Sequence, residues 1–178
     1  PRTTVTLEPC ENAVWDLLKH NHYLSRKLSP ASRCFAAVDA RGALVAFESR
    51  VSFRGAFAFA EHRFVVDPDY QGLGLANALS ANFARAHFRA GLLFYSRTSH
   101  PRLGCHRNGS PAWDARDSNG AAPKASTVAR GAPRVGFSHL YVGDAGDRAA
   151  FRASADAKDL SIVLRATSTR DYAARGAP

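Results

Sequence analysis

The chain has 178 residues, of which 46% are hydrophobic and 22% charged, and its formal net charge is +9. This composition is that of a globular protein with a real core, so we expect one domain over 1–178 and exclude a disordered chain. No apolar run approaches the length of a membrane span and the N-terminus lacks a signal pattern, which predicts a soluble, cytoplasmic protein. An odd number of cysteines without a CxxC pair indicates free thiols in a reducing compartment: Cys10, Cys34 and Cys105.

The positive charge is concentrated in residues 85–134. Nine Lys and Arg residues in this segment face only Asp114 and Asp117, which leaves +7. A field so concentrated attracts a polyanion, so the segment is a candidate surface for DNA or for a nucleotide-like substrate. Three other interpretations are open: a solvated face, charge that serves only the phosphates of a cofactor, and Arg-rich usage that reflects genomic base composition.

The first part of the chain predicts a strand, a helix and a strand meander. Residues 3–7 alternate like a short edge strand, and residues 11–20 carry apolar side chains at helical spacing. Strands at 34–38 and 43–51 are joined by the turn 39–42, which is a hairpin signal. Residues 57–66 form the next strand of the meander.

The second part predicts a long helix over 72–90, which Gly91 ends as a helix C-cap glycine, and a buried strand over 92–96. A short helix within 101–113 has weak support. Residues 114–133 form a mobile loop, rich in Gly, Ala, Pro and Ser from 118 on. Residues 134–142 return to the sheet, followed by a short helix at 149–157 and a last strand at 160–164. This order predicts an α/β (α+β layered) domain with one central sheet.

The most specific motif is V-V-D-P-D-Y-Q-G-L-G-L-A-N, residues 65–77. A strand ends, a tight turn follows, and a helix begins inside the glycine-containing segment. The first amides of a helix have no acceptor within the helix, and the helix dipole adds positive charge, so a pyrophosphate fits there. Gly72 and Gly74 let such a ligand approach the backbone. The alternatives are a structural glycine turn and a dinucleotide site, although the latter needs GxGxxG where this chain has GLGLAN.

Residues 71–76, Q-G-L-G-L-A, match Gln/Arg-x-x-Gly-x-Gly/Ala, and the segment resembles the signature of the GNAT N-acetyltransferase superfamily. The resemblance implies a GNAT fold: a mixed, mostly antiparallel sheet of about six to seven strands, flanked by helices. It also implies an acyl-CoA (acetyl-CoA) dependent N-acyltransferase. In that family the loop amides hold the CoA pyrophosphate, and the splayed strands 57–66 and 92–96 admit the pantetheine arm. The implied cofactor-binding residues are Val65, Val66, Gln71, Gly72, Leu73, Gly74, Leu75, Ala76 and Asn77.

Acyl transfer to an amine needs a base that removes a proton from the amine. Several members of the superfamily place a glutamate on the fourth strand roughly ten residues before the Gln/Arg, and Glu61 lies ten residues before Gln71. An ion pair with Arg63 is the alternative role. Strand alternation puts Glu61 and Arg63 on one face and His62 on the other, with His62 as the reserve base.

Four further residues are candidates for the acceptor side of the reaction. His22 and Tyr23 lie in the loop after the first helix, the region that closes over the acceptor in this fold, with a capping or packing role as the alternative. Ser99 follows the fifth strand, where its hydroxyl would orient a reactant or cap the next helix. Tyr141 is a candidate general acid toward the departing thiolate, with a place in the sheet core as the alternative. The spacing of His100, Cys105 and His106 matches no established site, so no metal is predicted.

The set H-Y-L-S, E-H-R, D-Y-Q-G-L-G and T-S-H-P resembles the acetyltransferase-like domain found fused to ABC-type ATPases and in phage-encoded proteins. The first segment also resembles the Mom family of phage DNA-modification proteins, which convert adenine in DNA to a carbamoylmethyl derivative. Such an enzyme would hold the duplex by its phosphates and flip the target base. The chain has no GxxxxGK[ST] motif, so any ATP-dependent role lies elsewhere.

Three hypotheses follow. The first is an acetyl-CoA-dependent N-acyltransferase that acts on a small amine or on an amine-bearing nucleotide. The second is a DNA-modifying enzyme of Mom type, phage-encoded and active in the host cytoplasm. The third is a CoA-binding or DNA-binding domain that has kept the fold without the chemistry.

Overall fold

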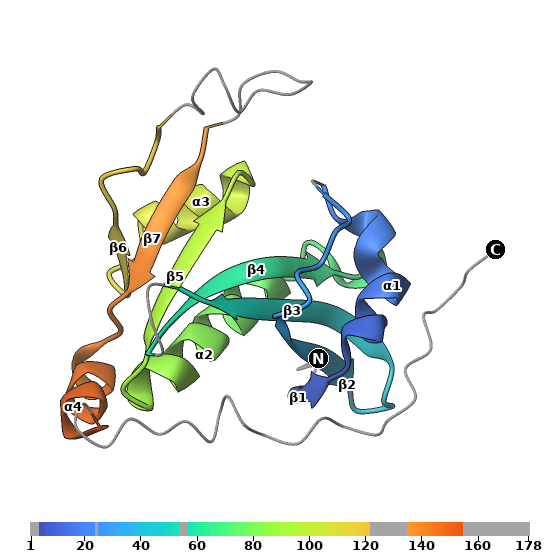
Figure 1. The fold of residues 1–178 in the computed structure, drawn as a ribbon, viewed down its shortest axis with the longest axis horizontal. Coiled ribbons are helices and arrows are strands. Elements are labelled where there is room, and N and C mark those ends of the chain that lie inside the picture. The colour runs from blue at the N-terminus through green and yellow to red at the C-terminus, as the bar shows by residue number, and fades with distance from the viewer. Residues whose placement is uncertain (1–3, 24, 54–56, 122–134, 155–178) are drawn as a thin grey trace. The chain divides into compact units, whose positions relative to one another are not determined.

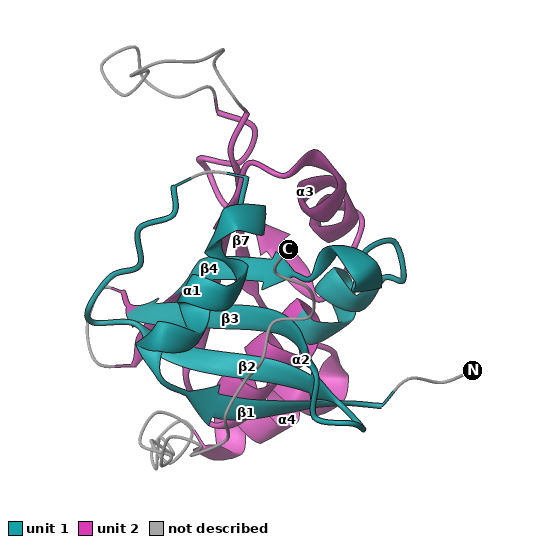
Figure 2. Ribbon diagram, turned by 90° about the vertical axis from the view of Figure 1, so that its right-hand side faces the viewer, with its two compact units in different colours: residues 1–51, 61–79, 160–178 teal, residues 52–60, 80–159 magenta. Residues whose placement is uncertain are grey.

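The computed structural model describes residues 4–23, 25–53, 57–121 and 135–154 (Figure 1). Two compact units divide the chain: unit 1 contains residues 1–51, 61–79 and 160–178, and unit 2 contains residues 52–60 and 80–159 (Figure 2). Within the described ranges, every helix is too short or too polar to cross a membrane. The expectation of one domain over 1–178 stays a prediction.

Seven strands are hydrogen-bonded in the order β1-β2-β3-β4-β5-β7-β6 in the described part of the chain. β1 (Val5–Cys10) and β3 (Leu44–Ser52) flank β2 (Arg33–Asp39), and both pairings are antiparallel. β4 (Ala58–Val66) and β5 (Leu93–Thr98) are parallel, whereas β7 (Phe137–Tyr141) pairs antiparallel with β5 and with β6 (Trp113–Ala115). The predicted mixed, mostly antiparallel sheet is confirmed.

The hairpin between β2 and β3 is closed by one aspartate. The Asp39 carboxylate accepts hydrogen bonds from the amides of Arg41 and Ala43, both at 2.9 Å, and from the Tyr70 hydroxyl at 3.0 Å. The hydrogen bond from the Ala43 amide, together with the hydrogen bonds from Arg41 and Tyr70, lowers the pKa of Asp39 to about 2. Gly42 has a φ of 79°, which a residue with a Cβ rarely adopts, so the predicted turn is confirmed with its chemistry.

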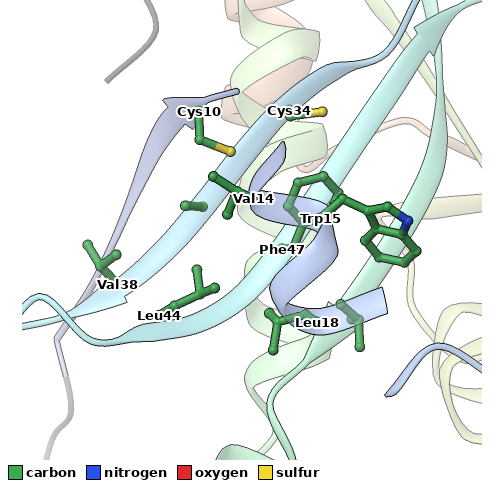
Figure 3. Packing of buried hydrophobic residues seen from close by; sticks show 10 residues of the cluster. Cys10, Val14, Trp15, Leu18, Cys34, Val38, Leu44 and Phe47 are labelled. Carbon is green, nitrogen blue, oxygen red and sulfur yellow. The ribbon is translucent and has the colours of Figure 1, made fainter. Parts of the chain in front are cut away.

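The core of unit 1 lies under a short mixed helix. The predicted helix at 11–20 consists of a 3₁₀ turn (η1, Asn12–Val14), one α turn (α1, Trp15–Leu18) and a second 3₁₀ turn (η2, Lys19–Asn21). Its N-cap, Glu11, makes no side-chain capping bond, which is consistent with the tighter first turn. Figure 3 shows Trp15 beside Phe47 of β3, and their ring centroids are 5.2 Å apart.

Unit 2 packs aromatic rings against β5. Phe83 and His87 of α2 (Leu75–Arg89) contact Phe94, with ring centroids 5.7 and 5.0 Å from it. His87 is fully buried, and its Nδ1 lies 2.7 Å from the Phe83 carbonyl oxygen. The unit also contains α3 (Pro101–Asn108) and α4 (Ala145–Ser154). These contacts place alternate β5 residues, Phe94 among them, on the side of the helix α2.

Several boundaries differ from the prediction for local reasons. α2 begins at Leu75 instead of residue 72, because Gly72 and Gly74 have φ values of 80° and 76°, outside the helical region. The start of the expected loop, 114–133, instead contributes to β6, and Ala121 forms a bridge with Gly136. Residues 122–133 and the predicted strand 160–164 lie outside the described residues.

Gly91 provides a test of the helix ending. Its φ is 78°, and a Cβ added there would lie 2.6 Å from the Ser154 carbonyl oxygen. We expect Gly91→Ala to lower the free energy of unfolding by about 2 kcal/mol or more, because it adds left-handed strain and a clash with backbone. Gly109→Ala is the matched control, since its added Cβ meets nothing closer than 3.8 Å. Equal stability of the two variants in urea unfolding would contradict this account.

Candidate functional site

The predicted phosphate loop lies in unit 1 and is open to solvent. Residues 71–74 are exposed, and the Leu73 side chain is 67% exposed. A Cβ added to Gly72 or to Gly74 would meet no atom within 4 Å. Both glycines therefore face empty space and hold a backbone conformation that favours glycine.

The loop is held in place by two local contacts. Asp67 begins a 3₁₀ turn (η3, Pro68–Tyr70) and its carboxylate accepts a hydrogen bond from the Asp69 amide at 3.0 Å. The Gln71 side-chain amide donates to the Val66 carbonyl at 2.9 Å. Because these bonds tie the turn back to the end of β4, they fix the position at which residues 72–74 begin.

The arrangement suits an anion. The amide of Ala78 bonds to the Gly74 carbonyl at 3.2 Å as α2 begins, and the amides that precede it in a helix have no acceptor inside the helix. The positive end of the dipole of this 15-residue helix lies at the same place. A cradle that glycines leave open, beside helix amides, fits a pyrophosphate.

The predicted main-chain contributors at the end of β4 are placed differently from the loop. Val65 and Val66 are both buried, in two separate core clusters of unit 1. The Val66 carbonyl already accepts the bond from Gln71. Leu75, Ala76 and Asn77 are half-buried in the first turn of α2. Their predicted contact with a cofactor stays a prediction.

A second group of predicted residues meets on β4 within unit 1. His22 contacts the rings of Trp15 and Tyr23, at centroid distances of 5.5 and 5.1 Å. Arg63 on β4 is close enough to act on His22 electrostatically. The loop after the first helix and the strand that carries Glu61 are therefore neighbours, which the sequence did not reveal.

The pKa of His22 is lowered to about 4. Burial is the larger cause, and the charge of Arg63 is the second. His22 is therefore neutral at physiological pH. It holds a proton weakly, which makes it a poor base for an amine. Tyr23, beside it, is 41% exposed.

His62 is committed to a structural bond. Its Nε2 accepts a hydrogen bond from the Ser29 amide at 3.1 Å, so this nitrogen carries no proton. Burial, and then the Arg63 charge, lowers the pKa of His62. Protonation of Nε2 would break the bond to Ser29, so His62 loses its place as the reserve base.

Arg63 is also held by the loop, as its Nε donates to the Lys27 carbonyl at 3.0 Å. His62 and Arg63, predicted on opposite faces of β4, both reach segment 27–29 with their side chains. Glu61 is half-buried at the adjacent position of the same strand. Its predicted role as the base stays a prediction.

Ser99 and its neighbours form the start of α3 in unit 2. His100 is the N-cap, with its Nδ1 accepting a hydrogen bond from the Leu103 amide at 3.4 Å. The Thr98 hydroxyl accepts from the His100 amide at 3.0 Å. Ser99 lies half-buried between them, and its predicted role in the reaction stays a prediction.

The described residues contain no group of three or more His, Cys, Asp or Glu suited to a metal ion.

Tyr141 is a core residue of unit 2. Its side chain has 0% exposure, and its hydroxyl donates to the Asp147 carboxylate at 3.0 Å. Burial and this bond raise the pKa of Tyr141 to about 12. A buried hydroxyl committed to a carboxylate is a structural element, which fits the alternative place of Tyr141 in the sheet core.

The same carboxylate uses part of the basic segment. Arg85 and Arg89 form ion pairs with buried Asp147 at 3.1 and 3.4 Å. Burial raises the pKa of Asp147, but the bonds from Tyr141 and Arg85 outweigh it and hold that pKa below its usual range. Two of the nine basic residues thus balance an internal charge.

Arg107 is 1% exposed, donates to the hydroxyls of Ser96 and Ser80, and lies over the Trp113 ring. Arg116 pairs with Asp114 on the surface. Among the described basic residues of 85–134, Arg97 and Arg102 are exposed without such an ion pair in the structure. Lys124, Arg130 and Arg134 lie outside the described residues. The charge available to a polyanion is therefore smaller than the count of +7 indicates.

Sequence reasoning missed two further groups. Glu48 and Arg50 of β3 are almost completely buried, with the Arg50 guanidinium 4.7 Å from the Phe35 ring centroid. A cavity in unit 2 is lined by Tyr95 and Arg97, among others. The alternation of Tyr95 and Arg97 with Phe94 and Ser96 was the available signal, but a strand of six residues does not show which face is hollowed.

The pKa of His22 is a direct test of the β4 neighbourhood. We expect its ring protons to titrate near pH 4 in NMR spectra, well below the ordinary value of 6.5. Arg63→Gln should raise this pKa part of the way, because the charge of Arg63 is removed while burial remains. Lys19→Gln, which removes a cation paired with Asp16, is the control and should leave it unchanged. A His22 that titrates near 6.5 in the wild type would refute the placement.

No protein-family model matches the chain, and no curated protein matches it either. Solved structures do match. The spermidine/spermine N-acetyltransferase of Vibrio cholerae is 13% identical with a TM-score of 0.57, covering 78% of this chain and 92% of its own. The ribosomal-protein-S18-alanine N-acetyltransferase of Escherichia coli is 14% identical with a TM-score of 0.57, covering 80% and 97%.

A third match is the spermidine N-acetyltransferase of Vibrio cholerae in complex with CoA and spermine. It is 12% identical with a TM-score of 0.59, and covers 81% of this chain and 98% of its own. Identities this low establish similarity of fold. Together with the seven-stranded order and the strand–loop–helix of residues 58–89, they show that this chain has the fold of the GNAT N-acetyltransferases.

Proposed function

We propose that the protein is an acyl-CoA-dependent N-acyltransferase that acetylates an amine, with the loop and first helical turn of residues 71–77 holding the phosphates of CoA. The observation that carries the proposal is the exposed loop in which Gly72 and Gly74 face empty space at the start of α2. The shared fold with N-acetyltransferases, one of them crystallised with CoA, supports the choice of cofactor. CoA would supply the activated acyl thioester.

The chain's own residues supply binding and proton transfer. The amides from Leu73 to Asn77 would bind the pyrophosphate, as helix-start amides bind anions. Glu61 would accept the proton that the amine must lose, while Tyr23 and neutral His22 border the same part of β4. The carboxylate is preferred over His62 because His62 Nε2 is already bonded to Ser29.

A nucleotide or a DNA base as acceptor is the narrower form of this proposal, and a Mom-like DNA modification is the second candidate. The exposed side chains of Arg97 and Arg102 favour a nucleotide or DNA acceptor in either form. Against it, Arg85, Arg89 and Arg107 are used inside unit 2. A changed nucleoside mass in DNA from cells that express the protein would establish the second candidate. The resemblance to the acetyltransferase-like domain found fused to ABC-type ATPases and in phage-encoded proteins stays a proposal.

The loop is tested by filling the space in front of its glycines. We expect Gly74→Val and Gly72→Val each to weaken CoA binding at least about tenfold in calorimetry, because the new side chain occupies the cradle. Gly120→Val is the matched control: Gly120 has the same φ of 76° and open surroundings, but lies in unit 2. Equal loss in all three variants would attribute the effect to backbone strain and contradict the cradle.

The base is tested separately. We expect Glu61→Gln to lower kcat by roughly 100- to 10,000-fold with CoA affinity unchanged, because a positioned base contributes about that much. Thiol release from acetyl-CoA with a panel of amines is the measurement, and exposed Glu11→Gln is the control. Wild-type protein that binds CoA but releases no thiol with any amine would favour the non-catalytic alternative.

A further inference from the structure

Unit 2 contains a cavity of about 400 Å³, which is within the size range of small-molecule sites. Its lining residues come from the β3–β4 connection, β4, β5, β7 and the segment after β6. Three half-buried residues and three exposed charged residues carry the argument: Phe53, Ala60, Tyr95, Arg97, Arg116 and Asp117.

The position of the cavity follows from the parallel ladder between β4 and β5. That ladder pairs Ala58 with Leu93, Phe59 with Phe94 and Ala60 with Tyr95. Both residues of its last pair line the cavity, where the small Ala60 leaves room and the Phe53 ring lies 5.0 Å from the Tyr95 ring. The cavity is therefore at the end of the ladder, with an apolar wall of two aromatic rings.

Strand alternation on β5 decides which of its side chains point toward the cavity. Phe94 points toward Phe83 and His87 of α2, and the Ser96 hydroxyl accepts a hydrogen bond from Arg107. Tyr95 and Arg97 therefore face away from α2. Arg97 is paired in register with Ser138 of β7, which also lines the cavity.

The charges of the wall select a ligand. Two guanidinium groups, Arg97 and Arg116, border the cavity with one carboxylate, Asp117. Arg116 also pairs with Asp114 at 3.4 Å, but both groups are exposed, and such pairs contribute little and rearrange readily. A polyamine would meet two cations for each anion, whereas a carboxylate or phosphate would find a planar donor pair.

We propose that this cavity binds the acceptor, and that the acceptor is an amine that also carries an anionic group. Arg97 and Arg116 bind the anionic group, the rings of Phe53 and Tyr95 bind the apolar stem, and Asp117 favours the end that carries the ammonium. The amine half of this assignment rests on the proposed function. The acceptor class differs from the spermidine and spermine named for the structural neighbours.

The assignment is tested by measuring ligand binding to the full chain. Binding is monitored by NMR titration, once in saturating CoA and once without CoA. L-phenylalanine against phenethylamine, and phosphoethanolamine against ethanolamine, are pairs that differ in the anionic group. We expect the anionic member of at least one pair to bind about tenfold or more tightly than its partner and than spermidine. Which pair responds decides between a carboxylate and a phosphate.

Arg97→Glu should abolish that preference, while Arg102→Glu, an exposed arginine of α3 outside the cavity lining, should retain it. Tightest binding of spermidine, an unaffected preference in Arg97→Glu, or displacement by a DNA duplex would each overturn the proposal. If CoA binds and no anionic amine does, this inference fails alone. If an anionic amine binds through Arg97 and CoA does not, the acyltransferase proposal fails and the cavity remains a binding site.

Discussion

The connection from β4 to α2 constrains the candidate function more than any other part of the structure. The chain must leave a buried strand at Val66 and start a helix at Leu75, and it does so through Asp67 and the side-chain amide of Gln71. Two glycines with positive φ then complete the turn. Because these bonds use local groups, the first amides of α2 remain directed at an open loop.

Part of the positive charge of unit 2 is held by partners inside the unit. Asp147 is almost completely buried and binds Arg85 and Arg89 of α2 and the Tyr141 hydroxyl of β7, so a single carboxylate holds three side chains from two elements. Arg107 is buried by a different device, with two serine hydroxyls and the face of Trp113. A count of charges along a sequence cannot separate such groups from a surface that binds a polyanion, because burial is decided by packing.

On β4, packing also decides which polar residue is available for chemistry. His22, His62 and Glu61 are similar candidates as letters of the sequence. In the fold, burial and Arg63 keep His22 neutral, and the Ser29 amide occupies Nε2 of His62. The proposal of Glu61 as the base therefore rests on its position ten residues before Gln71 and on the commitment of His62 to Ser29. The unit 2 cavity arises in the same way, from the small side chain of Ala60 opposite Tyr95.

The sequence by itself determined the elements whose signal is local. The hairpin at 39–42, the turn with Gly72 and Gly74, and the end of α2 at Gly91 depend on turn chemistry and left-handed backbone, which a few adjacent residues encode. Only the tertiary structure decided the three-residue strand β6, the burial of Tyr141 and Arg107, and the meeting of His22 with β4. Those features depend on contacts between segments far apart in the chain, and no local pattern records which distant side chain will satisfy a buried charge or line a cavity.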